Sequence, residues 1–407
     1  MLTTLALTLV TAPLGAAPLG DTEQPARIGI GATPFQIISD TEIIIDGVTY
    51  DSWEAVADSG YFHTEHTRCI TGFDDPGVDI RGTGADCDFN RTRVEPQYQP
   101  DQGVRRIPVV VHVIQSTSGT GFIPESRVRS QIDVLNEDFL AIAGTNGGAG
   151  DDAQIEFFLA TEDPQGNPTN GITYTTNNSW FNDSGSYWNA LAWDTNRYLN
   201  IYTNSASGAL GYVPSLPQGG IVGSNSDRVV VLYSSFGRNA PLVPFHLGRT
   251  TTHEVGHYLG LYHTFNGGCQ STASCATNGD RICDTNPESS PTFGCPGGRT
   301  SCGLPAPFDN YMDYADDICM ERFTPDQINR MRCTLENWRP NLAITGPQAC
   351  NAADLAEPLA VLDLADVQAF IDGFTAQQPI ADIAAPAGVF DLADVQAFID
   401  DFNSGCP

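Results

Sequence analysis

The clearest pattern along the chain is a series of short apolar runs separated by polar, glycine-rich stretches. Residues 105–116 form a nearly continuous β-branched run, which predicts a buried strand. Residues 124–140 carry apolar side chains at three- and four-residue intervals, which predicts an amphipathic helix. Four further runs predict strands: residues 153–160, 171–176, 197–203 and 227–237. This region therefore combines strands and helices.

The flanking segments are patterned differently. Residues 21–104 are rich in glycine and aspartate and weakly periodic, with one strand-like piece at residues 41–53. Residues 324–340 predict a closing helix, with Thr324 as its N-cap and Pro325 in its first turn.

The C-terminal tail contains a repeat of 28 residues. Residues 361–374 and 389–402 match at 12 of 14 positions. Each copy predicts a helix with one apolar face. In the first copy this face comprises Leu364, Val367, Phe370, Ile371 and Phe374. Two such helices can bury these faces against each other, and a Cys350–Cys406 bond would pin their ends.

Composition limits the classes of binding partner and indicates the cellular compartment. The chain has 49 acidic and 19 basic residues, a formal charge of −30, which disfavours nucleic acid and anionic membranes. Eleven cysteines indicate an oxidising compartment. Residues 1–20 combine an apolar stretch with small residues and are interpreted as a signal peptide. No apolar run reaches the roughly 18 residues of a membrane span. We therefore expect a secreted protein.

Three of the seven histidines lie within residues 253–263. His253 and His257 are four residues apart, so they share one face of a predicted helix and can bind the same ion. His263 can join them only if the chain turns sharply after the helix, and Gly260 permits that turn.

Three imidazoles with one open position describe a catalytic zinc site. Glu254 lies beside the histidines on the helix and can act as general base on a zinc-bound water, then pass the proton to the leaving amine. The spacing therefore predicts a zinc-dependent hydrolase whose reaction releases an amine.

The extended H-E-x-x-H-x-x-G-x-x-H pattern resembles the metzincin metallopeptidases. Met312 matches their methionine turn, and Tyr314 matches a tyrosine that stabilises the tetrahedral intermediate. Residues 105–342 as a whole resemble the pappalysin family, in its ulilysin-like branch. The resemblance implies an α+β fold with an α/β-type upper subdomain, a twisted five-stranded mixed sheet and an active-site helix behind it.

Further expectations come from the resemblance alone. It implies structural calcium after the third histidine, with Asp280, Asp284 and Thr285 as candidate ligands. It also implies a preference for Arg or Lys just after the cleaved bond, for which Asp316 and Asp317 are candidate pocket residues.

The preference for a basic residue predicts self-cleavage of the Val104–Arg105 or Arg105–Arg106 bond, which would remove residues 21–104 as a pro-segment. Within this segment, Cys69 either binds the zinc and keeps the enzyme latent, or pairs with Cys87.

The resemblance suggests disulfides Cys269–Cys295 and Cys302–Cys319. Elimination then leaves Cys275–Cys283, Cys350–Cys406 and an odd Cys333.

The tail, residues 350–407, resembles a small all-α dockerin-like module. Alanine and proline replace several oxygen donors of a dockerin loop, so strong calcium binding is not expected there. Its role is either docking to a partner or capping the chain with a helical hairpin. The sequence thus predicts a secreted zinc endopeptidase with a catalytic domain at residues 105–343 and peptide or protein substrates. The rival hypothesis is a non-catalytic adhesion protein on the same scaffold.

Overall fold

The computed structural model describes residues 35–71, 87, 98–100, 103–269, 275, 278–344, 351–356, 362–384 and 388–406. The predicted signal peptide lies outside this range. Within the described part of the chain, no helix has the length and apolar character needed to cross a bilayer.

The central element is the strand predicted from the longest β-branched run, β4 (Arg105–Gln115). Eight consecutive residues of β4 are buried, as expected for a strand covered on both faces. The sheet order is β5-β4-β7-β9-β8, and β6 pairs with β4 beyond the end of β5. The strands are β5 (Ile155–Leu159), β6 (Ile172–Thr176), β7 (Leu199–Asn204), β8 (Gly211–Tyr212) and β9 (Val229–Leu232).

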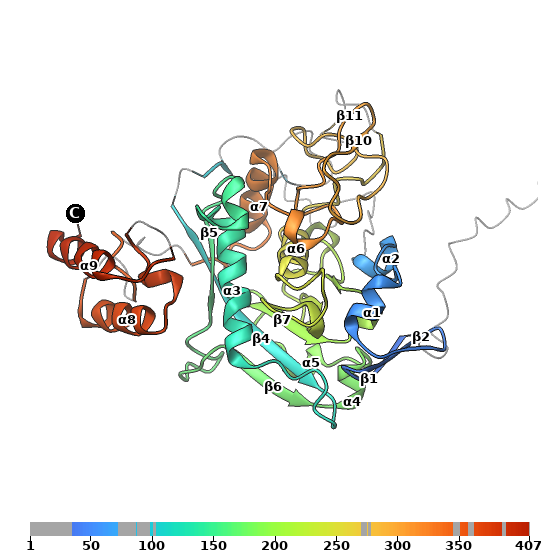
Figure 1. Ribbon diagram of the computed structural model, residues 1–407, viewed down its shortest axis with the longest axis horizontal. Helices are drawn as coiled ribbons and strands as arrows, with labels where there is room; N and C mark the ends of the chain where they lie inside the picture. The colour runs from blue at the N-terminus through green and yellow to red at the C-terminus, as the bar shows by residue number, and fades with distance from the viewer. Residues whose placement is uncertain are drawn as a thin grey trace, which may run out of the picture. The chain divides into compact units, whose positions relative to one another are not determined.

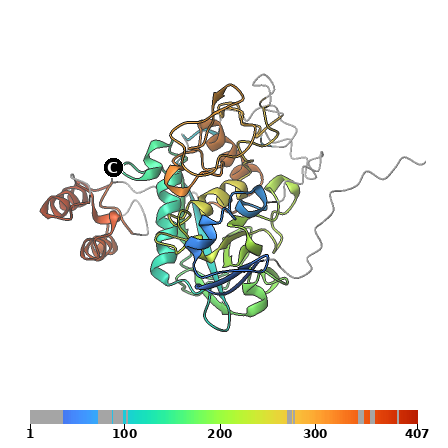
Figure 2. The ribbon, with the colours of Figure 1, turned by 45° about the vertical axis from the view of Figure 1, so that its right-hand side comes forward.

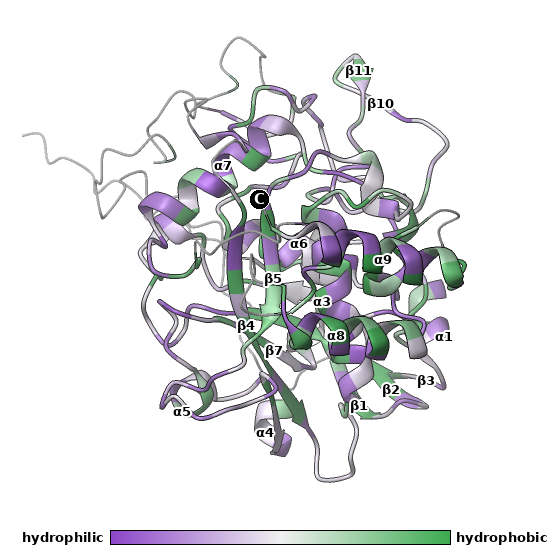
Figure 3. Cartoon of the chain, turned by 90° about the vertical axis from the view of Figure 1, so that its left-hand side faces the viewer, coloured by the Kyte–Doolittle hydropathy of each residue, from purple (hydrophilic) through white to green (hydrophobic). Residues whose placement is uncertain are grey.

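This arrangement confirms the predicted mixed sheet. All pairs are parallel except β8–β9, which is antiparallel and places β8 at the edge. The six strands occupy five positions, because β5 and β6 share one side of β4. Helices α3 (Glu125–Phe139) and α6 (Arg249–Tyr258) contact each other, and α6 also contacts β8 and β9 (Figure 1). The long strands are coloured as mainly hydrophobic in Figure 3.

Further helices complete this part of the chain. They are α4 (Asn178–Phe181) and α5 (Trp188–Leu191) between β6 and β7, and the closing helix α7 (Pro325–Asn337). As predicted, Thr324 caps α7, and it does so in a capping box with Gln327. A two-stranded hairpin, β10 (Thr300–Ser301) and β11 (Leu304–Pro305), lies in the long loop after the histidines.

The N-terminal segment is more ordered than its weak periodicity suggested. It forms an antiparallel three-stranded sheet of β1 (Phe35–Ser39), β2 (Glu42–Ile45) and β3 (Val48–Tyr50), followed by α1 (Trp53–Asp58) and α2 (Glu65–Arg68). Its aromatic residues pack on residues 105–343; Trp53 contacts Tyr233 edge to face, for example, and Phe62 contacts Phe245 in the same way. In Figures 1 and 2 these elements, in blue, lie beside α6.

Two predicted disulfides are wrong. The structure pairs Cys269 with Cys302 and Cys295 with Cys319. The backbone N–H of Asp316 donates to the carbonyl of Gly294, which brings Cys295 to the 319 loop. Cys302 follows β10 at the tip of the hairpin, where it meets Cys269 instead.

The remaining cysteines give a mixed result. Cys275–Cys283 is confirmed. Cys333 is not odd but pairs with Cys87, which also excludes the alternative Cys69–Cys87 bond. Cys69 is a free thiol. Cys406 is disulfide-bonded as predicted, whereas its expected partner Cys350 lies outside the described residues.

The tail contains the two predicted helices, α8 (Leu364–Thr375) and α9 (Leu392–Ser404). Their faces meet through Phe370 and Phe398, whose rings stack with centroids 4.2 Å apart. Leu364 and Ile371 were expected in this contact but are exposed, at 78% and 50%. At 100° per residue, Leu364 lies about 80° and Ile371 about 60° around the helix from Phe374, so the contact between the two helices does not bury them fully. Both helices show mixed apolar and polar faces in Figure 3.

Aspartates hold the ends of these helices. Asp363 and Asp366 form a capping box at α8, and Asp391 and Asp394 repeat it at α9. These four aspartates therefore act as helix caps.

Candidate metal centre

The three histidines come together as their spacing predicts. Helix α6 presents His253 and His257, and its C-cap is Leu259. Gly260 follows with φ +94°, the left-handed conformation expected at the turn. A side chain at Gly260 would also meet the Thr334 hydroxyl at 2.7 Å. The turn brings His263 back, so that the three Nε2 atoms lie 3.0–3.1 Å from one another.

The hydrogen bonds of the rings show that this cluster fits a cation. His253 Nδ1 lies 2.7 Å from the carbonyl oxygen of Tyr311, and His257 Nδ1 lies 2.7 Å from that of Leu261. A carbonyl only accepts, so each Nδ1 carries the proton and each Nε2 presents a lone pair. Two lone pairs facing each other repel unless a cation lies between them. Tetrahedral zinc bound to two imidazoles would hold their nitrogens roughly 3.3 Å apart, close to the observed spacing.

Burial keeps the imidazoles neutral. It lowers the pKa of His257 to about 4 and lowers the pKa values of His253 and His263 well below their usual range, with a smaller contribution from repulsion between the rings at the latter two. Neutral imidazole is the form that binds a metal.

Glu254 and Tyr314 lie beside the cluster. The Tyr314 hydroxyl lies 3.2 Å from His263 Nε2. Glu254 is fully buried, and burial raises its pKa to about 8. Gly211 on β8 allows this approach, because a side chain there would meet Glu254 Cγ at 2.7 Å. Glu254 Oε1 has no hydrogen-bond partner.

Met312 lies beneath the histidines as the predicted methionine turn. A side chain at Gly256 would meet the Met312 sulfur at 2.5 Å, so any larger residue at this position of α6 would have to displace Met312. The Met312 carbonyl accepts from Thr264, directly after His263, and the preceding Tyr311 carbonyl orients His253. The turn thus positions two of the three histidines.

Cys69 occupies the open side of the cluster. Its sulfur and the ligand atoms of the three histidines all lie within 4.8 Å of one another. Its S–H donates to Thr71 and, at 3.6 Å, to Glu254 Oε2. Burial and the charge of Glu254 raise the pKa of the thiol, and a metal cation would oppose this by favouring the thiolate.

The chain around Cys69 follows the edge of the sheet. Cys69 forms a parallel bridge with Gly211 of β8, and Ile70 N–H donates to the Gly211 carbonyl. On either side, Leu210 N–H donates to the Thr67 carbonyl and Val213 N–H donates to the Thr71 hydroxyl. Residues 67–71 therefore cover β8 beside the candidate metal centre.

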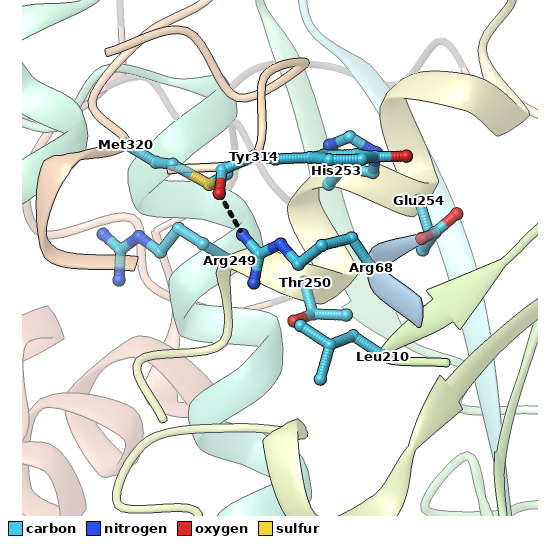
Figure 4. Close-up of a pocket in the computed structure, with 8 residues that line it drawn as sticks. All are labelled: Arg68, Leu210, Arg249, Thr250, His253, Glu254, Tyr314 and Met320. Carbon is cyan, nitrogen blue, oxygen red and sulfur yellow. Dashed lines mark hydrogen bonds between the residues drawn. The ribbon is translucent and has the colours of Figure 1, made fainter. Parts of the chain in front are cut away.

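Arg68 lines a pocket together with His253, Glu254 and Tyr314, a position that the sequence did not predict (Figure 4). Its Nη2 donates to the carbonyls of Tyr314 at 3.0 Å and Ala315 at 2.6 Å. Its guanidinium stacks on the Phe245 ring, 4.1 Å from the centroid. The signal in the sequence was a basic residue directly before the cysteine, in a chain expected to bind basic side chains.

Asp316 and Asp317 both act on Arg68 electrostatically, since their charges oppose the effect of burial on its pKa. Asp317 is buried, and its Oδ2 accepts from the N–H groups of Leu247 and Arg249. Asp316 is partly exposed and has one buried oxygen, Oδ1, without a hydrogen-bond partner.

The residues predicted to bind calcium make different hydrogen bonds. Asp280 and Thr285 meet, with the threonine hydroxyl 2.6 Å from Asp280 Oδ2, in a pocket also lined by Thr264 and Asn266. Asp284 lies at the start of α7 instead, where it accepts from the Thr324 hydroxyl and the Asp326 N–H. The charge of Asp284 also contributes to the raised pKa of Asp280, so the two carboxyls are neighbours.

Comparisons with known proteins agree with this geometry. Residues 182–336 match the Peptidase_M43 family model, described as pregnancy-associated plasma protein-A. An extracellular metalloprotease of Verticillium alfalfae is 36% identical over 248 residues, covering 57% of this chain and 76% of the relative. One of Coccidioides posadasii is 36% identical over 238 residues, covering 56% and 76%.

Solved structures show the same similarity. Mature mirolysin of Tannerella forsythia, in complex with a cleaved peptide, aligns with a TM-score of 0.52 and 37% identity, covering 60% of this chain and 97% of that one. A promirolysin mutant of the same organism aligns with a TM-score of 0.52 and 36% identity, covering 60% and 86%. With this catalytic-domain match, the chain belongs to the pappalysin-type M43 family of metzincins and is a metalloendopeptidase.

Proposed function

We propose that the protein is a secreted zinc endopeptidase that is held latent by its own N-terminal segment and prefers Arg or Lys after the cleaved bond. The observation that carries the proposal is the cluster of three mutually facing Nε2 atoms with Cys69 on its fourth side. Zinc would be held by His253, His257 and His263, and when bound it supplies Lewis-acid chemistry toward a peptide carbonyl and a nearby water.

Two residues beside the cluster would assist the reaction. Glu254 Oε1 has no partner in this latent arrangement, and its carboxylate would take the proton of the attacking water and deliver it to the leaving amine. The Tyr314 hydroxyl lies beside His263 and would donate to the developing oxyanion. The rival, a non-catalytic adhesion protein, would have no need of this arrangement.

Residues 67–71 cover the surfaces to which we expect the substrate to bind. When this stretch leaves, the edge of β8 is open to an extended peptide. The pocket of Arg68 is also vacated, with two carbonyls, the Phe245 ring and the charges of the two aspartates left to receive a basic side chain.

Removal of the metal tests the proposed cofactor. We expect a chelator to abolish peptide hydrolysis by the processed enzyme and one equivalent of zinc to restore it, because no described acid or base can replace a Lewis acid in this site. The unfolding temperature should fall on chelation and recover with zinc, since zinc binds the folded site preferentially. Full hydrolysis by metal-free protein, measured with metal analysis of the same sample, would refute the proposal.

The preference for basic residues can be tested at Asp316, which faces Arg68 without holding the backbone as Asp317 does. We expect Asp316→Asn to lower kcat/KM roughly 3- to 10-fold for a peptide with Arg after the cleaved bond, because one unit of negative charge near the guanidinium is lost. A peptide with Leu at that position serves as the internal control and should be cleaved at an unchanged rate. An equal loss for both peptides would contradict the pocket assignment.

We also propose that calcium binds between Asp280 and Thr285. Burial raises the pKa of Asp280 to about 7, so without calcium the neutral carboxyl favours the folded state below the ordinary pKa and this stability is lost as the pH rises through 7. Calcium needs the ionised carboxylate, so protons compete with it. Calcium should therefore raise the unfolding temperature more at pH 8 than at pH 6.

Two variants distinguish this calcium site from the hydrogen bonds at the start of α7. Asp280→Asn should abolish the calcium-dependent increment, whereas Asp284→Asn should lower stability with and without calcium and leave the increment intact. Equal increments at both pH values in the unmodified protein would remove Asp280 from the site.

The tail contains the two helices expected of a docking module or of a helical hairpin cap. Both roles remain proposals. Secretion is supported by the extracellular relatives.

A further inference from the structure

The Cys87–Cys333 disulfide joins the segment before the catalytic domain to helix α7, across 246 residues of sequence. Both cysteines are completely buried, in a cluster with Tyr98 and Trp338. A soluble reductant cannot reach this bond without local opening of the fold. The bond is therefore a lasting part of the protein.

Backbone contacts around the disulfide reinforce this attachment. The Cys87 carbonyl accepts from Gln218 at 3.1 Å and from Arg330 at 3.3 Å. Arg330 also donates to the carbonyl of Gly260, at the turn that brings His263 to the cluster. Arg330 thus binds both the Cys87 carbonyl and the turn that positions His263.

The chain after Cys87 is held in a similar way. The buried Arg332 donates to the carbonyls of Tyr98 and Gly103 and also to that of Ala153, which precedes β5. Arg105 opens strand β4 in register with Ile155 and pairs with Glu336 of α7. Described residues on both sides of the Val104–Arg105 bond are therefore integrated with the catalytic domain.

The disulfide changes what a cut at this bond can do. Cys69 lies 18 residues from Cys87 but 35 residues from Val104. Eighteen residues span at most about 60 Å even when fully extended, so a group at the end of that connection stays at roughly millimolar effective concentration. The shorter connection to Cys87 already sets that concentration, so breaking the longer one does not lower it.

We propose that the stretch from Cys87 to Val104 is a permanent, disulfide-linked part of the mature enzyme, and that a cut at Val104–Arg105 nicks the chain without activating it. Activation requires a break on the N-terminal side of Cys87, which releases Cys69 and Arg68 together. This inference rests on the proposed latency through Cys69, and it changes the expected role of the 104–105 cut from release of the whole segment to a nick.

The experiment uses the full chain with a recognition sequence for an unrelated site-specific protease. In one version the sequence is inserted between Gly103 and Val104, and in the other between Thr71 and Cys87. Hydrolysis of an Arg-containing peptide is measured before and after each cut. The masses of the cut protein chains are determined by mass spectrometry with and without reduction of disulfides. A third version carries the 103–104 insertion together with Cys87→Ser and Cys333→Ser.

We expect the cut after Gly103 to leave activity within about twofold of the uncut chain, with one product before reduction and two after it. The cut before Cys87 should release the N-terminal fragment and raise activity at least about 10-fold. Removing both cysteines should make the first cut activating as well.

Full activation by the cut after Gly103, with the fragment still disulfide-linked, would overturn the inference. So would loss of the fragment before reduction. If the double-serine version does not fold, the two insertions in the unmodified background still decide the question. A Cys69→Ser chain serves as reference: if it and every cut sample are inactive, it is the proposed function that fails.

Discussion

Replacing Glu254 by alanine is expected to lower kcat/KM of the processed enzyme by about 10²- to 10⁴-fold, the usual contribution of a general base. The carboxylate is buried beside the histidines, and within the described residues no second carboxylate joins that cluster. Its loss therefore leaves the attacking water without a proton acceptor. The measurement is the steady-state rate on an Arg-containing peptide.

The control for this variant is Glu125→Ala, which removes an exposed glutamate that pairs with Arg129 on α3. This variant should keep full activity. Glu254→Ala should still bind one metal ion and unfold cooperatively, because the three imidazoles remain. If the metal-loaded, folded variant hydrolyses peptide at the unmodified rate, Glu254 is not the general base.

The second large effect is expected at Cys69. The Cys69→Ser variant of the full chain should hydrolyse peptide without any processing, with a gain on the order of 10²-fold over the intact unmodified chain. A serine hydroxyl is a much weaker zinc ligand than a thiolate, so the fourth side of the cluster opens to solvent and substrate. The rate is measured before any cut is detectable by mass spectrometry.

Ile70→Ser provides the matched comparison. Ile70 is the next residue of the same stretch, is 38% exposed, and contacts β8 through its backbone N–H, which the substitution retains. That variant should stay latent. Equal activation of both variants would mean that loosening of the stretch, not loss of the thiol, opens the site.

The local part of the site could be predicted because it is encoded within a few turns of chain. The four-residue spacing of His253 and His257 fixes a shared helix face, and Gly260 supplies the only kind of turn that returns His263. The β-branched run of β4 and the Thr324 N-cap of α7 are equally local signals. Each of these predictions was confirmed.

The remaining features depend on contacts between distant parts of the sequence. Arg68 meets the carbonyl of Tyr314 across 246 residues, and Cys87 meets Cys333 across the same interval. Neither contact leaves a periodic pattern, and disulfide pairing cannot be deduced from cysteine positions alone. The exchange of partners between Cys295 and Cys302 has the same origin, because the β10–β11 hairpin decides which sulfurs meet.

The tail shows a different limit. An apolar stripe predicts that a helix has a buried face but does not give the width of the contact, so Phe370 was predicted correctly and Leu364 was not. Likewise, an aspartate in a loop is a possible cation ligand in sequence, whereas Asp363 and Asp366 cap a helix in the structure.

X-ray absorption spectroscopy at the zinc edge tests the central claim most directly, on the intact chain and on the enzyme cut before Cys87. The account predicts three nitrogen neighbours at about 2.0–2.1 Å and one sulfur at about 2.3 Å in the intact chain, with the sulfur replaced by oxygen or nitrogen after the cut. An intact chain that shows no sulfur neighbour, or a metal with fewer than three imidazoles in both samples, would contradict it.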